Sequence, residues 1–186
     1  MIKKIIIIPL FVVLFASALS CQSLKLGFRV EPTLMFVNDM NESAFRFSPY
    51  GMYLSAQFEP VEWLNLEFRP GYLIAGEDYL GTEFGAYVKL KILQPHLYII
   101  VGVNNHSNIA SGHNSGGGYS KQILYKGIGI GFQKDSHLSF DVMYYWTSDK
   151  NFAYSFVTDW LTYSKIVQKQ MNAVVQVGFC LAWDIL

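Results

Sequence analysis

The chain has 186 residues, enough for one domain, and only 15% of them are charged, against roughly 25% in typical soluble domains. Fourteen acidic residues balance fourteen basic ones, and 52% of the residues are hydrophobic. This composition excludes a disordered chain and argues against nucleic acid as a partner, since nucleic-acid binding requires a basic surplus. Two cysteines are too few for a disulfide scaffold or a zinc ribbon.

Residues 1–21 have the features of a signal peptide, and residues 22–186 are expected to form the mature domain. Lys3 and Lys4 precede an apolar run over residues 5–16, which small residues follow. As a helix, this run would reach only about 18 Å, short of a hydrocarbon core of roughly 30 Å. We therefore predict a cleaved secretory signal rather than a retained membrane helix.

Cys21 leaves two kinds of processing open. Cleavage beside Cys21 is the interpretation that we favour, and it leaves Cys180 as a lone thiol. The alternative is a bacterial lipoprotein signal, because small residues precede this cysteine. That signal prefers leucine three places before the cysteine, where Ala18 stands in this chain.

From residue 24 onward, apolar and polar residues alternate with a period of two, which is typical of strands with one apolar face. Met52 and Leu54, for example, alternate with Tyr53 and Ser55. The alternation predicts eight strands, within residues 24–36, 50–59, 64–72, 83–92, 96–104, 124–132, 138–146 and 172–183.

The volume of the apolar face indicates that it points outward. It carries roughly forty mostly bulky residues, whereas an eight-stranded barrel holds only packed side chains or one small ligand. The polar face has five bases and five acids, as suits an enclosed interior with paired charges: Lys25, Arg29, Arg69, Lys89, Lys91, Glu31, Glu59, Glu67, Glu83 and Asp141.

Three expectations follow from this assignment of the two faces. Val88→Arg should be costly because Val88 faces lipid, and Gly85→Ser should be milder because Gly85 faces inward. Arg69 should contact at least one inward acid, namely one of Glu59, Glu67 and Glu83.

The connections alternate between tight turns and longer loops. Connections two, four and six are tight, at residues 60–63, 94–95 and 135–136, whereas residues 107–121 and 148–169 form long loops. Short turns on one rim and long loops on the other are typical of transmembrane barrels. Both chain ends adjoin the short-turn rim, so we predict that both termini are periplasmic.

The last strand contains the pattern Gln176, Gly178, Leu181 and Trp183. With this pattern, residues 24–183 resemble the small eight-stranded outer-membrane barrels of the OmpA and OmpX type. The resemblance implies an all-β fold, a closed antiparallel eight-stranded transmembrane β-barrel in the bacterial outer membrane. It also implies outer-membrane lipid and lipopolysaccharide as surroundings, and recognition of the terminal pattern by the barrel-assembly machinery.

The fifth connection holds the candidate polar site, with His106 and His113. Outer-membrane lipid A deacylases carry a His-any-Ser-Asn motif, and residues 113–115 fit its first three places, but Gly116 replaces the asparagine. His106 directly precedes Ser107, and the chain places no acid near either histidine. Two histidines also lack the third ligand of a metal site, so we predict neither a metal nor another cofactor.

The seventh connection carries an unusual number of aromatic residues: Phe152, Tyr154, Phe156, Trp160 and Tyr163. One interpretation is that the strands extend beyond the membrane. The other is a surface that binds a ligand or partner, because tyrosine and tryptophan are favoured in binding hot spots. With His106 and His113, these residues are the candidate binding residues of the chain.

We therefore predict a non-enzymatic outer-membrane barrel with a structural or surface-contact role through its long extracellular loops. One alternative is a lipid A-modifying hydrolase at the rim. The other is a porin-like conduit for small apolar molecules, against which five large inward tyrosines argue: Tyr53, Tyr87, Tyr98, Tyr125 and Tyr145.

Overall fold

The computed structural model describes residues 23–39, 42–93, 96–113, 115–158 and 164–185. The predicted signal peptide and Cys21 lie outside these residues. The described strands are β1 (Ser23–Val30), β2 (Thr33–Asp39), β3 (Glu42–Ser48), β4 (Tyr50–Val61), β5 (Leu64–Ile74), β6 (Leu80–Leu93), β7 (Leu97–Asn108), β8 (Gly112–His113), β9 (Gly116–Gly118), β10 (Lys121–Gln133), β11 (Leu138–Trp146), β12 (Asn151–Thr158) and β13 (Ser164–Asp184). Nowhere in the described part is there a helix long and apolar enough to cross a membrane.

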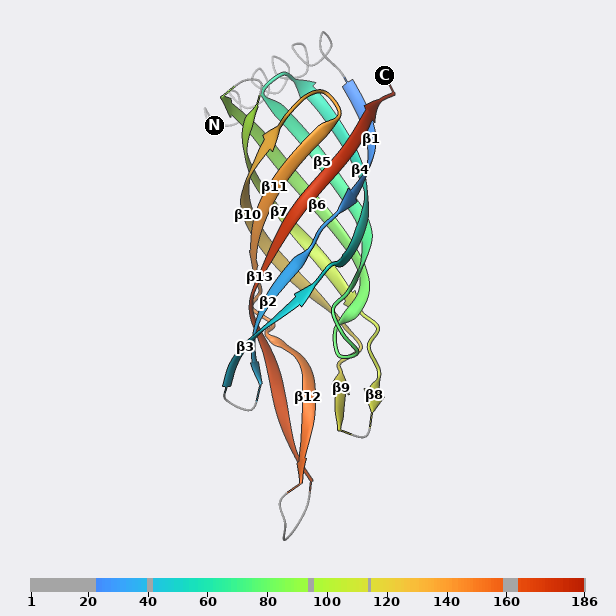
Figure 1. The fold of residues 1–186 in the computed structure, drawn as a ribbon, viewed down its shortest axis with the longest axis vertical. Coiled ribbons are helices and arrows are strands. Elements are labelled where there is room, and N and C mark those ends of the chain that lie inside the picture. The colour runs from blue at the N-terminus through green and yellow to red at the C-terminus, as the bar shows by residue number, and fades with distance from the viewer. Residues whose placement is uncertain (1–22, 40–41, 94–95, 114, 159–163, 186) are drawn as a thin grey trace, which may run out of the picture.

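Antiparallel pairing connects eight strands in a ring. The order is β1, β4, β5, β6, β7, β10, β11 and β13, and β13 pairs again with β1. We call this ring, with the strand β2 that continues β1, the barrel (Figure 1). Pro32 separates β1 from β2, because proline has no backbone N–H to donate to a neighbouring strand.

The expected alternation of faces is confirmed along the barrel strands. On β4, the outward Leu54 is 62% exposed, whereas the inward Tyr53 is 3% exposed. On β13 the alternation is interrupted, because the pairing with β2 shifts register between Met171 and Ala173. An unbroken alternation from Gln176 would turn Asn172 inward, but this bulge places Met171 in the buried interior instead.

The short turns and the two described ends of the chain lie at the same end of the barrel (Figure 1). Lys25 is opposite Asp184 in the pairing of β1 with β13. At the turn between β10 and β11, the backbone N–H groups of Leu138 and His137 each donate to Asp135 Oδ1 at 2.8 Å. These two hydrogen bonds hold the pKa of Asp135 below its ordinary value.

At the opposite end, the sheet extends beyond the barrel as paired hairpins (Figure 1). The strand β3, in a segment that the alternation did not assign to a strand, pairs with β2. The strand β12 pairs with the outer half of β13 and with β9, and β9 pairs with β8. We call this set of strands the loop-end sheet. It supports strand extension as the interpretation of the seventh connection.

Candidate functional sites inside the barrel and at its loop end

A cluster of three bases and three acids fills the middle of the barrel: Arg29, Arg69, Lys89, Glu31, Glu67 and Asp141. We call it the central ion cluster. Arg29 contacts Glu31 through Nε at 2.7 Å and Asp141 through Nη2 at 2.7 Å. Glu67 accepts contacts from Arg69 at 2.7 Å and from Lys89 at 2.8 Å. The charges balance within the cluster, as enclosed charges require.

The expected contact of Arg69 with one of three acids is confirmed through Glu67. Its other partners are each at 3.2 Å: Glu31 lies between β1 and β2, and Asp141 lies on β11, which does not adjoin β5. The guanidinium also lies 4.1 Å from the centre of the Tyr87 ring. Contacts across the lumen occur because an eight-stranded barrel is narrow enough for long side chains to meet at its axis.

The terminal pattern of β13 is divided between the two faces. Gln176 and Gly178 are enclosed, whereas Leu181 and Trp183 are exposed on the outer face. Gln176 Nε2 donates to the Tyr53 hydroxyl at 3.3 Å. Two residues of the pattern therefore also contribute to the packing of the interior.

We expect Gly178→Ala to lower the free energy of unfolding by about 1–3 kcal/mol, as overpacking does. A Cβ at this position would lie 2.2 Å from Arg29 Nη2 and 2.4 Å from Asp141 Oδ1, so the ion pair must move. Denaturant unfolding of protein refolded in detergent measures this loss. Asn172→Ala, at the bulge of the same strand, is the control. Equal stability of the two variants would contradict the prediction.

A second polar cluster surrounds Glu83, nearer the loop end of the barrel. The carboxylate accepts hydrogen bonds from the Tyr53 hydroxyl at 2.7 Å and from Asn104 Nδ2 at 2.6 Å, and it pairs with His106 Nδ1 at 2.9 Å. The His106 ring stacks on Tyr79 with a centroid distance of 4.0 Å.

The expectation that His106 lies in an exposed loop is wrong. The strand β7 continues to Asn108, so His106 faces the interior and is 0% exposed. The expectation that no acid lies near it is also wrong, because the pairing of β6 with β7 places Glu83 opposite His106. Ser107, the neighbour considered as a nucleophile, is on the other face of β7.

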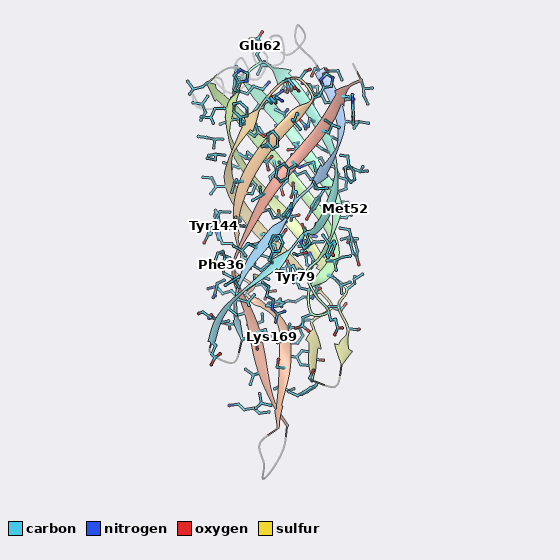
Figure 2. The ribbon with its side chains drawn as sticks, viewed as in Figure 1. Phe36, Met52, Glu62, Tyr79, Tyr144 and Lys169 are labelled. Atoms are coloured by element: carbon cyan, nitrogen blue, oxygen red, sulfur yellow. The ribbon has the colours of Figure 1, made fainter. Side chains whose placement is uncertain are left out.

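Charged side chains connect the loop-end sheet to the barrel mouth. Asp78, between β5 and β6, contacts Lys169 Nζ of β13 at 2.7 Å and Arg46 Nη1 of β3 at 3.5 Å. The same two bases each lie 3.5 Å from Asp39 of β2. Figure 2 shows Lys169 at this end of the molecule and Glu62 at the opposite, short-turn end. Sequence spacing gave no signal for this cluster, because its members come from four separate segments.

Phe152 belongs to the core. The second interpretation of the seventh connection placed it on an exposed binding surface, and for this residue that interpretation is wrong. The Phe152 side chain is 0% exposed and contacts Tyr79 edge to face at 5.5 Å. Arg46 lies 6.0 Å from its ring centre. Phe152 therefore anchors β12 over the mouth of the barrel.

The remaining candidates divide into two groups. Tyr154 is half-buried, and the centre of its ring lies 5.2 Å from that of Tyr119 and 5.3 Å from that of Phe156. Phe156 itself is exposed. Trp160, Tyr163 and the side chain of His113 lie outside the described residues. In the part of the chain that the structure describes, no three His, Cys, Asp or Glu side chains form a group that could hold a metal ion.

Comparison with known proteins finds similarity among solved structures alone. No family model and no curated protein matches the chain. The chain is similar to Neisserial surface protein A (NspA), with 13% identity over 87% of this chain and 99% of that chain and a TM-score of 0.43. It is also similar to Ail, the attachment invasion locus protein of Yersinia pestis, with 14% identity over 87% of this chain and 97% of that chain and a TM-score of 0.36.

A further match is Ail in complex with the heparin analogue sucrose octasulfate, with 13% identity over 87% of this chain and 97% of that chain and a TM-score of 0.37. The matched proteins are small eight-stranded outer-membrane β-barrels of the OmpA/OmpX-like kind, the kind that the sequence resembles.

Proposed function

We propose that this chain is a closed transmembrane barrel of a bacterial outer membrane, with periplasmic termini, that makes surface contacts through its loop-end sheet. The outer face supports the membrane placement. Leu54, Ile130 and Phe68 are exposed there within a continuous apolar surface, and soluble proteins rarely expose such a surface. Lipid is the solvent that makes this surface favourable.

The construction of the loop-end sheet is the observation that favours surface contact. Ala153 of β12 pairs with Gly118 of β9, so two long connections support each other. Phe152 and the contact of Lys169 with Asp78 attach this sheet to the barrel. Loops held in one shape lose little freedom when they bind, and such preorganisation increases affinity.

The other two functions have less support in the interior. A conduit needs an open path, whereas Arg29, Arg69 and the five inward tyrosines are all buried in the interior. Arg29 contacts Asp141 there, and the hydroxyls of Tyr87 and Tyr145 share a hydrogen bond. A rim hydrolase that used His106 would need this ring at the surface, whereas it is enclosed against Glu83 and Tyr79.

The terminal pattern is the proposed contact with the barrel-assembly machinery. Gln176 and Gly178 are enclosed in the folded barrel, whereas Leu181 and Trp183 remain exposed. We propose that the machinery reads all four positions on β13 before the strand pairs with β1.

Replacing residues 153–168 with a short glycine-serine turn tests the surface-contact role. We expect the variant to insert in the outer membrane and to keep the heat-dependent gel mobility of a folded barrel. Cells that display it should attach severalfold less to protein-coated and glycan-coated surfaces, and should aggregate less, than cells that display the parent chain. Glu62→Gln at the short-turn end is the control. Unchanged attachment and aggregation would contradict the surface-contact role.

Cysteine labelling on intact cells tests the orientation. Glu77→Cys, at an exposed residue of the connection between β5 and β6, should react with a membrane-impermeant maleimide. Glu62→Cys, between β4 and β5, should react only after the outer membrane is opened. The parent chain supplies the background, because Cys180 is buried. Labelling of Glu62→Cys but not Glu77→Cys on intact cells would reverse the proposed orientation.

A further inference from the structure

The outer face of the barrel carries the basic side chain of Lys126. Among the charged residues of β1, β4, β5, β6, β7, β10 and β11, Lys126 is the one whose side chain is exposed, and it lies on this outer face. Its neighbours across β11 and β7 are Trp146 and Val103. Lys126 forms no ion pair with any described residue, whereas the inward bases of the central ion cluster are all paired.

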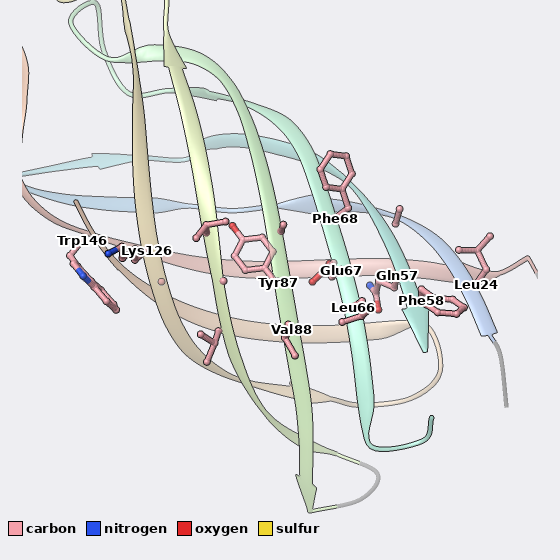
Figure 3. Close-up of a pocket in the computed structure, with 16 residues that line it drawn as sticks. Leu24, Gln57, Phe58, Leu66, Glu67, Phe68, Tyr87, Val88, Lys126 and Trp146 are labelled. Atoms are coloured by element: carbon pink, nitrogen blue, oxygen red, sulfur yellow. The ribbon is translucent and has the colours of Figure 1, made fainter. Parts of the chain in front are cut away.

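A groove of about 870 Å³ begins at Lys126 and crosses the outer face obliquely (Figure 3). It runs from Lys126 and Trp146 on one side to Phe58 and Leu24 on the other. The groove follows residues that are paired across neighbouring strands. Lys126 of β10 is opposite Val103 of β7, and Val103 is opposite Ala86 of β6.

Small residues on the outer face form the floor of the groove. Ala86 and Ala56 are the residues opposite Phe68 on its two neighbouring strands. A larger side chain at either alanine would fill the space that Phe68 and Val88 border. The result is an apolar trough, open to the side, with a positive charge at one end.

The position of Lys126 identifies the level of the membrane that it faces. Trp146, which lies opposite it, is the last residue of β11 before the long seventh connection, and tryptophan favours the membrane interface. A lysine at this level extends its ammonium toward the headgroups while its stem lies along apolar surface. The groove continues from that level toward the hydrocarbon core.

We propose that this groove binds a phosphorylated glycolipid of the outer leaflet, lipopolysaccharide, with an acyl chain in the trough and a lipid A phosphate on Lys126. The inference rests on the proposed membrane placement and on the loop end being extracellular. A phosphate complements the unpaired ammonium, and the alanine floor accommodates a chain of methylene groups. Lys126 is in the loop-end half of β10. The phosphate that binds it therefore belongs to a lipid of the outer leaflet, which carries the glycolipid.

Native mass spectrometry of the refolded protein in detergent tests this site with three probes: lipid A with its phosphates, the same lipid without them, and phosphatidylglycerol. We expect the parent chain to retain phosphorylated lipid A in preference to the other two. Lys126→Gln should weaken this retention about tenfold, as loss of one charge-assisted hydrogen bond does. Lys134→Gln, at an exposed lysine of the short-turn end, should retain the lipid as the parent does.

Ala86→Phe tests the trough separately, because it fills the floor and leaves Lys126 in place. It should also reduce retention of phosphorylated lipid A, while heat-dependent gel mobility shows that the barrel is folded. Equal retention by Lys126→Gln and the parent would overturn the role of the charge. Equal retention of dephosphorylated lipid or phosphatidylglycerol would overturn the choice of ligand.

These outcomes can be separated from failure of the membrane placement. If the labelling of Glu77→Cys and Glu62→Cys follows the proposed orientation while Lys126→Gln retains lipid A normally, the glycolipid site is wrong and the placement stands. If the labelling is reversed, the placement itself is wrong.

Discussion

Arg69→Leu is expected to lower the free energy of unfolding by about 3–5 kcal/mol, because it leaves buried acids of the central ion cluster with too few bases. Arg69 contacts Glu67, Glu31 and Asp141 and is 1% exposed, so water cannot replace these contacts in the folded barrel. Denaturant unfolding in detergent, followed by tryptophan fluorescence, measures the loss.

Two further variants separate the loss of charge balance from the loss of packing. Lys121→Leu removes a partly exposed contact with Asp149 at the rim and should cost about 1 kcal/mol or less. The double variant Arg69→Leu with Glu31→Leu leaves two bases and two acids, and it should recover part of the stability that Arg69→Leu loses. A double variant less stable than the sum of the two single changes would show that charge balance is not the cause.

Val88→Arg is expected to cost about 2–4 kcal/mol in lipid, because Val88 faces outward near the middle of β6, where the bilayer is least able to solvate a charge. Refolding titrations into lipid bilayers measure this cost. Thr82→Arg is the matched control, since Thr82 is exposed on the same face of the same strand but close to the loop end. It should cost about 0–1 kcal/mol. Equal costs at the two positions would contradict the assignment of this face to lipid.

Gly85→Ser is not the mild comparison that the alternation alone predicts. A Cβ at Gly85 would lie 2.4 Å from the Tyr87 ring, which folds back over the glycine on the same strand. The Tyr87 hydroxyl also shares a hydrogen bond of 2.7 Å with the Tyr145 hydroxyl across the lumen. A serine at position 85 must displace this ring and disturb that pair, so we expect a clear loss of stability.

Local sequence was sufficient for the strands and for the direction of each side chain. Side chains alternate between the two faces of any strand, so Leu54 and Tyr53 could be assigned to opposite faces without knowledge of their neighbours. The excess of bulky apolar residues then determined which face is outside, because a narrow barrel has no room for them. Tight turns such as Asp135–Ser136 could be located for the same reason, since they interrupt the alternation.

Contacts between strands could not be obtained in this way, because they depend on the register of strands far apart in the chain. The pairing of β6 with β7 brought Glu83 to His106, although 22 residues separate them in the sequence. The fold of the seventh connection carried Phe152 onto Tyr79, although its aromatic neighbours suggested an exposed surface. Side-chain alternation repeats every two residues and is local, whereas the stagger of the strands decides which inward residues meet across the lumen, and that stagger exists only once the sheet has formed.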